Sequence, residues 1–303
     1  MINIHFLVDN LSFSDITQFQ EGQHNTCALS SEGLKCEHGL SLFIESPYGN
    51  ILCDMGASDT FLHNAKQLGI DLSSTNYGFI SHGHSDHTGG LGAFLDAFPD
   101  KKIYASSRIF SEYYFSGRRG YRRPMSTDHT LATTHPDQLL YTDSSRWINP
   151  HIAAVYNNCH KWEKPFGNIY LTKGVSENPQ PLPDSSFEEP VPDDFLHEMA
   201  LVLKLEDGLV IISCCSHAGA INIMESCTGF TGEKRIIAFI GGLHFIDSPQ
   251  VEKEVMHFTE GLEKNYPNTR IITGHCTSNP AKEFLKKRVP GIEFFYTGHQ
   301  ISI

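Results

Sequence analysis

The feature of this sequence that most constrains its fold is the segment 80–90, which reads Ile-Ser-His-Gly-His-Ser-Asp-His-Thr-Gly-Gly. The apolar residues 77–80 predict the end of a buried strand, and residues 91–98 predict a helix that follows. The strand therefore delivers three imidazoles and one carboxylate into a tight turn, where Gly83 lets the backbone fold closely. Neutral imidazole and carboxylate are ligands for zinc and neighbouring first-row metals. The spacing favours two adjacent ions, one on His82 and His84 and the other on Asp86 and His87.

The composition excludes several classes of protein. With 40% hydrophobic and 19% charged residues, the 303-residue chain has the balance of a soluble globular protein with a sizeable core. No apolar run approaches the roughly 20 residues of a membrane helix. A formal net charge of −12 argues against sequence-independent binding of nucleic acid, which depends on clustered cations. The eight cysteines show no Cys-x-x-Cys spacing and the first residues do not resemble a signal peptide, so we expect a cytoplasmic protein.

Short strands and helices alternate on both sides of the motif. We predict strands at 2–8, 40–45, 50–53, 77–80, 102–105, 199–206, 209–213, 235–240 and 270–273, and a further helix at 58–68. The alternation is lost over 106–194, and residues 176–194 are rich in Pro, Ser and acidic side chains. We therefore predict a single domain, 1–303, with an insertion at about 106–194 that forms a lid.

Several of the predicted strands end in a ligand-type residue. The residues concerned are Asp54 after 50–53, His217 after 209–213, His244 after 235–240 and His275 after 270–273. Because the strands of layered α/β folds present their loops at one edge, these side chains are expected to meet the motif. We favour His217 and His275 as metal ligands, and His244 as a contact to a ligand or to the substrate. Glu198, just before the strand 199–206, is predicted to be a surface carboxylate, with an acid that supports the site as the alternative.

These motifs resemble those of the metallo-β-lactamase superfamily, and the resemblance covers essentially the whole chain. It implies an α/β fold, a four-layer αβ/βα sandwich with a dinuclear metal edge. The segments 37–41, 213–219, 241–244 and 274–277 are similar to a subfamily of metal-dependent hydrolases. Some of its members are named 7,8-dihydropterin-6-yl-methyl-4-(β-D-ribofuranosyl)aminobenzene-5′-phosphate synthase. The carboxylate that bridges the two metals in the superfamily is not evident, and Cys215 lies near its expected place.

Roles follow from the motif and the resemblance together. One ion is assigned to His82, His84 and His217, and the other to Asp86, His87 and His275. Zinc is the expected metal, with manganese or iron as alternatives. Asp54 either orients a ligand imidazole or holds its own turn. Cys215 is a neighbour of the site, a ligand, or a buried small residue. Asp86 and His244 are predicted to be catalytic, and His38 to contact the substrate.

The segment 118–123, Arg-Arg-Gly-Tyr-Arg-Arg, concentrates positive charge in an acidic protein. Arginine pairs bidentately with phosphate and carboxylate. If the segment folds over the metal edge, substrate contacts are expected from Arg118, Arg119, Arg122 and Arg123. The alternatives are a solvated basic loop and a subunit contact. The expected partner is a small anionic substrate, phosphorylated or carboxylated, and neither nucleic acid nor a membrane.

The leading functional prediction is a dinuclear metallohydrolase that uses a metal-bridging hydroxide on an ester, in particular a phosphoester. Such a metal pair brings the pKa of bound water near 7 and polarises a substrate oxygen. One alternative is a transferase like the pterin-type synthase. Another is a member of the fold that binds a small molecule without catalysis.

Overall fold

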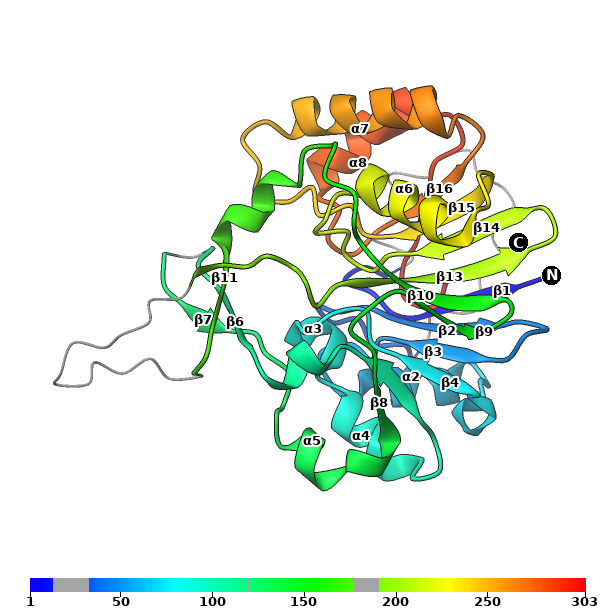
Figure 1. Cartoon of the computed structure of the whole chain (residues 1–303), viewed down its shortest axis with the longest axis vertical. Coiled ribbons are helices and arrows are strands. Elements are labelled where there is room, and N and C mark those ends of the chain that lie inside the picture. The colour runs from blue at the N-terminus through cyan, green and yellow to red at the C-terminus, as the bar shows by residue number, and fades with distance from the viewer. Residues whose placement is uncertain (13–32, 119, 177–190) are drawn as a thin grey trace, which may run out of the picture.

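Two seven-stranded sheets are stacked in the computed structural model, which describes residues 1–12, 33–118, 120–176 and 191–303 (Figure 1). The first sheet contains, in spatial order, β18 (Gln300–Ser302), β1 (Asn3–Val8), β2 (Ser41–Glu45), β3 (Ile51–Cys53), β4 (Tyr77–Phe79), β5 (Ile103–Ala105) and β8 (Leu139–Tyr141). The second contains β17 (Glu293–Phe294), β16 (Arg270–Thr273), β15 (Ile236–Gly241), β14 (Gly208–Ile212), β13 (Met199–Leu205), β10 (Ile152–Tyr156) and β9 (Arg146–Asn149). In each sheet the strands that lead to the predicted site residues run parallel to one another.

Helices cover the outer face of each sheet (Figure 1). Those on the first sheet are α2 (Thr60–Gln67) and α4 (Leu91–Ala97), with the single-turn helices α3 (Ser85–Thr88) and α5 (Leu131–Thr134) nearby. Those on the second sheet are α6 (Ala220–Thr231), α7 (Val251–Asn265) and α8 (Asn279–Arg288). The predicted four-layer αβ/βα sandwich is thus confirmed. Short 3₁₀ turns occur at Leu72–Ser74, Ser107–Phe110, Pro136–Gln138 and Phe166–Tyr170. Among the described residues, no helix combines the length and the apolar character needed to cross a membrane.

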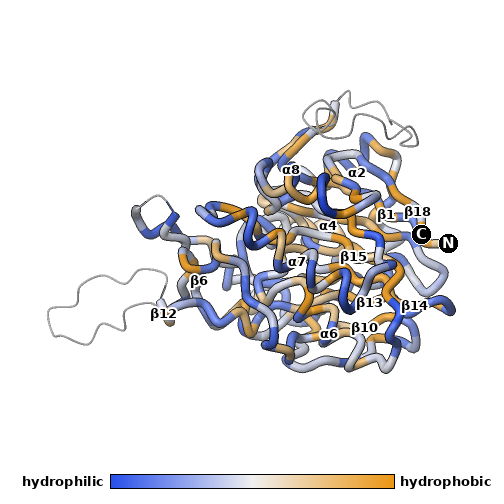
Figure 2. Tube along the Cα trace, turned by 90° about the horizontal axis from the view of Figure 1, so that it is seen from above, coloured by the Kyte–Doolittle hydropathy of each residue, from blue (hydrophilic) through white to orange (hydrophobic). Residues whose placement is uncertain are grey.

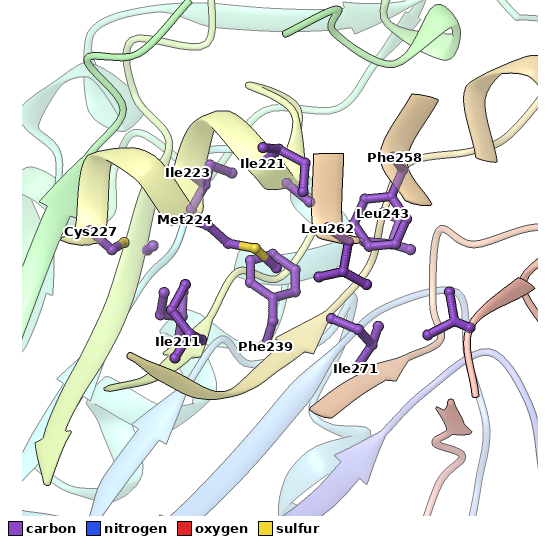
Figure 3. Close-up of a cluster of buried hydrophobic side chains, with 14 of the residues drawn as sticks. Ile211, Ile221, Ile223, Met224, Cys227, Phe239, Leu243, Phe258, Leu262 and Ile271 are labelled. Atoms are coloured by element: carbon purple, nitrogen blue, oxygen red, sulfur yellow. The ribbon is translucent and has the colours of Figure 1, made fainter. Parts of the chain in front are cut away.

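The strands are apolar on both faces because each sheet packs against the other sheet and against helices. In β14, Ile212 lies between the two sheets, whereas Ile211 lies under the helices, as the period of two in a strand requires. Figure 3 shows Ile211 and Phe239 of the second sheet beside Met224 of α6 and Leu262 of α7. In Figure 2 the hydrophobic segments accordingly follow the inner strands. This double burial explains why most core strands were visible as apolar runs in the sequence.

The predicted insertion at 106–194 is wrong in its extent, because three of its strands belong to the core. Strand β8 pairs with β5, and β10 joins β9 to β13. Strands β8 and β9 lie at the edges of their sheets and have partly exposed side chains, so they lack the continuous apolar pattern of the inner strands. Strand β10 is an inner strand and is buried. Part of the remainder forms a small antiparallel sheet of β12 (Val191–Pro192), β11 (Leu171–Gly174), β6 (Tyr113–Ser116) and β7 (Arg123–Pro124). Most of the segment 176–194 that was predicted to belong to a lid lies outside the described residues. The small sheet lies to one side of the sandwich (Figures 1 and 2).

The turn after α3 packs tightly against the loop that follows β3. A Cβ added at Gly89 would meet the backbone oxygen of Ala57 at 2.1 Å. We expect Gly89→Ala to destabilise the fold by about 3 kcal/mol, because backbone atoms would have to move. The matched control is Gly229→Ala, in α6, where an added Cβ meets nothing within 4 Å. It should stabilise by about 0.5 kcal/mol through higher helix propensity. Thermal unfolding checks both, and equal melting temperatures for the two variants would contradict this packing.

Candidate metal centre

The motif occupies the turn between β4 and α3, beside the small sheet (Figure 1). Gly83 is required there because an added Cβ would meet the Tyr114 ring at 2.6 Å. The small sheet also braces the turn, since the Ser85 amide donates to the Met125 carbonyl at 2.7 Å. Single-turn helix α3 then carries Asp86 and His87. The predicted strand-to-helix turn is therefore held on both sides by packed residues.

A first group of three histidines meets at this turn. His82 and His84 come from the turn, and His217 comes from the loop after β14. One ligand-type nitrogen from each lies within 4.8 Å of the other two, and all three residues are buried. The structure thus brings together side chains that are far apart in the sequence, as predicted for the first ion.

In each ring of this group, one nitrogen is held by another polar group. The contacts are His82 Nδ1 with Ser81 Oγ at 2.8 Å, His84 Nε2 with Asp193 Oδ2 at 3.4 Å and His217 Nδ1 with Asn168 Oδ1 at 3.1 Å. The opposite nitrogens remain for a metal. The Nε2 atoms of His82 and His217 are buried, and neither has a hydrogen-bond partner within the described part of the chain. A buried polar atom without a partner is costly, and a metal ion would satisfy these.

A second group consists of Asp86, His87 and His275. The Nε2 atoms of His87 and His275 are 3.1 Å apart, and Asp86 Oδ2 lies 3.7 and 3.5 Å from them, respectively. Tetrahedral zinc with ligands at about 2.1 Å would separate its ligand atoms by about 3.4 Å. The three atoms are therefore spaced as ligands of one ion would be. Nδ1 of His275 is again held from outside, by Asn10 Oδ1 at 3.1 Å.

Asp54 orients ligand candidates of both groups. Its Oδ2 accepts from His87 Nδ1 at 2.7 Å and from the Ser81 hydroxyl at 2.6 Å, while Oδ1 accepts from the Ser81 amide at 2.7 Å. Because the Ser81 hydroxyl donates to Asp54, its oxygen accepts from His82 Nδ1. Asp54 has a positive φ of 55°, a strained conformation for a non-glycine residue. It lies where an orienting residue is needed, and it also holds its own turn.

The two groups differ in the charge that their side chains favour. Burial and neighbouring histidines hold the pKa of His82 well below its usual value, so the ring is neutral, as a metal ligand must be. Burial would also lower the pKa of His87, but the carboxylates of Asp86 and Asp54 outweigh it and raise the pKa to about 9. Burial would raise the pKa of Asp86, but His87 and His275 hold it well below its usual value. The second group therefore favours a positive charge, which a divalent cation would supply.

Three further predicted residues lie at the edge of these groups. Cys215 Sγ is 3.2 Å from His87 Nε2 and is buried. His38 Nε2 is 3.4 Å from Asp86 Oδ2, with an exposed side chain. The His244 ring stands 4.2 Å from that of His217, and its Nε2 accepts from Arg118 at 3.1 Å. All three line a cavity of about 330 Å³ over the metal centre.

The arginines of the segment 118–123 have different surroundings. Arg118 and Arg123 line the cavity over the metal centre. Arg122 does not line it: its guanidinium lies over the Phe115 ring, 5.6 Å from the centroid. A contact between Arg122 and the substrate therefore stays a prediction. Arg119 lies outside the described residues.

Sequence reasoning missed several residues that hold the ligands. Asn10 and Asn168 lie in loops, and no local pattern marks them. Asp193 is bound by His84 and by His197, whose Nδ1 accepts from the Gly83 amide at 3.0 Å. The i, i+4 spacing of Asp193 and His197, just before β13, was the signal in the sequence that could have revealed them. Glu198 is not a surface carboxylate: it is buried and accepts from the amides of His217 and Ala218 at 2.7 and 2.9 Å.

Comparisons with known proteins agree with this geometry. Residues 34–196, more than half of the chain, match the family described as "Metallo-beta-lactamase superfamily". The chain is 26% identical over 291 residues to 7,8-dihydropterin-6-methyl-4-(beta-D-ribofuranosyl)-aminobenzene-5'-phosphate synthase of Methanocaldococcus jannaschii, covering 88% of this chain and 90% of that protein.

Solved structures show the same relationship. The crystal structure of Tm1679, described as a metal-dependent hydrolase of the beta-lactamase superfamily, superposes with a TM-score of 0.74 at 26% identity, covering 100% of this chain and 99% of that chain. The metallo-beta-lactamase fold protein YhfI from Bacillus subtilis reaches a TM-score of 0.51 at 10% identity over the whole of both chains, which shows a common fold. With its fold, its converging histidines and these matches, the chain belongs to the metallo-β-lactamase superfamily.

Proposed function

We propose that this protein is a hydrolase that depends on two divalent metal ions, zinc in the first place, and cleaves a phosphoester of a small anionic substrate. One observation carries the proposal. Five histidines each have one ring nitrogen held by a protein acceptor and the other directed to one of two groups, with Asp86 as the carboxylate of the second. Fixed tautomers of this kind are typical of metal-ligating histidines.

The proposed first ion would be held by His82, His84 and His217, and the second by Asp86, His87 and His275. Bound there, the ions would supply Lewis acidity and lower the pKa of water. The protein holds the imidazoles: Asn10 and Asn168 each accept from a ring Nδ1–H and donate to the backbone carbonyl of the same histidine. This double contact fixes both the amide orientation and the tautomer.

His244 is proposed to contact the substrate. Arginine has no acceptor, so the hydrogen bond from Arg118 requires an unprotonated Nε2 on His244. Burial, followed by the Arg118 charge, holds the pKa of His244 well below its usual value. The neutral ring therefore carries its proton on Nδ1, which has no partner among the described residues. An N–H in this position can donate to a substrate oxygen at the metal edge.

A transferase is the second candidate function. The relative of Methanocaldococcus jannaschii that matches 88% of this chain is named a synthase, and its name contains a 5'-phosphate. Both candidates use a metal edge and a phosphorylated substrate. They differ in whether water or a second substrate accepts the transferred group.

The test is metal analysis combined with turnover. Protein purified without chelator should contain two ions per chain and hydrolyse bis(4-nitrophenyl) phosphate. Chelation should abolish release of nitrophenol, and added zinc should restore it. Hydrolysis that persists after complete metal removal would contradict the proposal. Two ions without hydrolysis, together with condensation of a pterin-type compound with a phosphorylated aromatic riboside, would favour the transferase.

A further inference from the structure

The cavity over the metal centre continues into an outer chamber of about 500 Å³. The two share His38, Arg118, Arg123 and Ile246 in their walls, so a ligand can extend from one into the other. The outer chamber is also lined by Tyr121, whose ring is exposed. Among the described residues, none of the six that make up the two metal-binding groups lines this outer chamber. It therefore suits a portion of the substrate that does not react.

The two arginines shared by these cavities are in different states. Arg118 is engaged: its Nε lies 2.8 Å from Asp247 Oδ2, and one terminal nitrogen donates to the Gly167 carbonyl and to His244. Its side chain is 20% exposed, and its charge is balanced by Asp247. Arg118 therefore positions His244 and forms part of the wall, with little charge left for a ligand.

Arg123 is free to bind an anion. It is exposed, and its guanidinium makes no ion pair or hydrogen bond with another described residue. Its backbone is held in the small sheet, where Arg123 of β7 pairs with Ser116 of β6. A cation on a braced strand, with no ion-pair partner in the described part of the chain, is pre-organised for recognition of phosphate or carboxylate. In a protein with a net charge of −12, such a cation also offsets the general repulsion of anions.

We propose that the outer chamber binds a second anionic group of the substrate and that Arg123 recognises it. This inference rests on the proposed function, because the metal centre is taken to hold the reacting phosphoester. The substrate is then a molecule with two separated anionic groups, one hydrolysed at the metals and one held by Arg123. The shared chemistry of the second group is that of a phosphate or a carboxylate.

The test is calorimetric binding, which does not require turnover. The probes are α,ω-bisphosphonates with alkyl spacers of increasing length, their ω-carboxy phosphonate analogues, and alkyl monophosphonates of equal length. Wild-type zinc protein should bind the bisphosphonate or carboxy phosphonate of optimal length roughly 10–100-fold more tightly than the monophosphonate, as expected for one charge-assisted contact. Arg123→Gln should remove this difference and leave monophosphonate binding unchanged, and Arg123→Lys should restore part of it.

Arg122→Gln is the matched control. It removes an equal charge at the adjacent residue, which lines neither cavity, so this variant should bind like wild type. Equal loss of affinity in Arg122→Gln and Arg123→Gln would overturn the inference in favour of general electrostatic attraction. A monophosphonate that binds as well as every two-headed probe would also overturn it, while the metal-centre proposal would stand. If zinc-loaded protein bound no phosphonate at all, both the inference and the proposed function would fail.

Discussion

Replacing Asp86 with alanine is expected to leave one metal ion per chain and to lower phosphoester hydrolysis about a thousandfold. Removing a group that only orients a ligand typically costs 10–100-fold, so loss of a ligand should cost more. Asp86 Oδ2 lies within 3.4–3.7 Å of His38, His87 and His275. It is also the carboxylate that holds the second group together, so without it two facing imidazoles remain with less negative charge nearby. Metal content by mass spectrometry and steady-state hydrolysis check this result.

The matched control for Asp86 is Cys215→Ser. Cys215 Sγ contacts the same ligand candidate, His87 Nε2, at 3.2 Å. Of the three roles open to Cys215, we expect that of a neighbour and not that of a ligand. The variant should keep both ions and most of the activity. Loss of one ion in Cys215→Ser would instead make the thiol a ligand. Retention of two tightly bound ions in Asp86→Ala would contradict the assignment of Asp86.

Replacing Asp54 with alanine should weaken both metal binding and the fold. Three hydrogen bonds end on this fully buried carboxylate, from His87 Nδ1, the Ser81 amide and the Ser81 hydroxyl. Their loss leaves buried donors unsatisfied, which should cost about 3 kcal/mol or more of unfolding free energy. Metal affinity should fall by about 10–100-fold, because His87 loses its orientation directly and His82 loses it through Ser81. Chelator competition and thermal unfolding measure the two effects.

Two variants separate orientation from general destabilisation. Asp54→Asn keeps the shape and one acceptor, so it should recover part of the stability while metal affinity stays low. Asp71→Ala removes an exposed carboxylate that accepts from the Ser73 amide at 2.9 Å. It should lower the free energy of unfolding only slightly, through loss of a helix cap, with unchanged metal affinity. If Asp54→Ala bound zinc as tightly as Asp71→Ala, the orienting role of Asp54 would be wrong.

Much of the architecture was predictable because the inner strands are buried on both faces. Strands such as β14 and β15 appear as short apolar runs, and each is followed by a histidine that the structure brings to the metal edge. Edge strands β8 and β9 were missed because solvent on one side permits polar residues such as Arg146. The predicted insertion therefore wrongly included β8 and β9, which belong to the core sheets.

The arginine segment shows another limit of the sequence. Arg118 and Arg123 have the same local signal. Arg118 is balanced by Asp247, whereas Arg123 lies in the cavity wall without an ion-pair partner among the described residues. Arg122, adjacent to Arg123, packs on Phe115. Which guanidinium can bind a substrate depends on contacts with residues far along the chain, and composition does not contain that information.

The sequence by itself determined the metal-binding motif, because four ligand-type side chains lie within one turn and their chemistry and spacing are local. It also indicated which strand ends would contribute His217 and His275. Only the tertiary structure decided which groups orient these candidate ligands, since His84 meets Asp193 109 residues later and His275 meets Asn10 265 residues earlier. Such contacts form when sheets and loops pack, and the free energy that selects them is shared over the whole core.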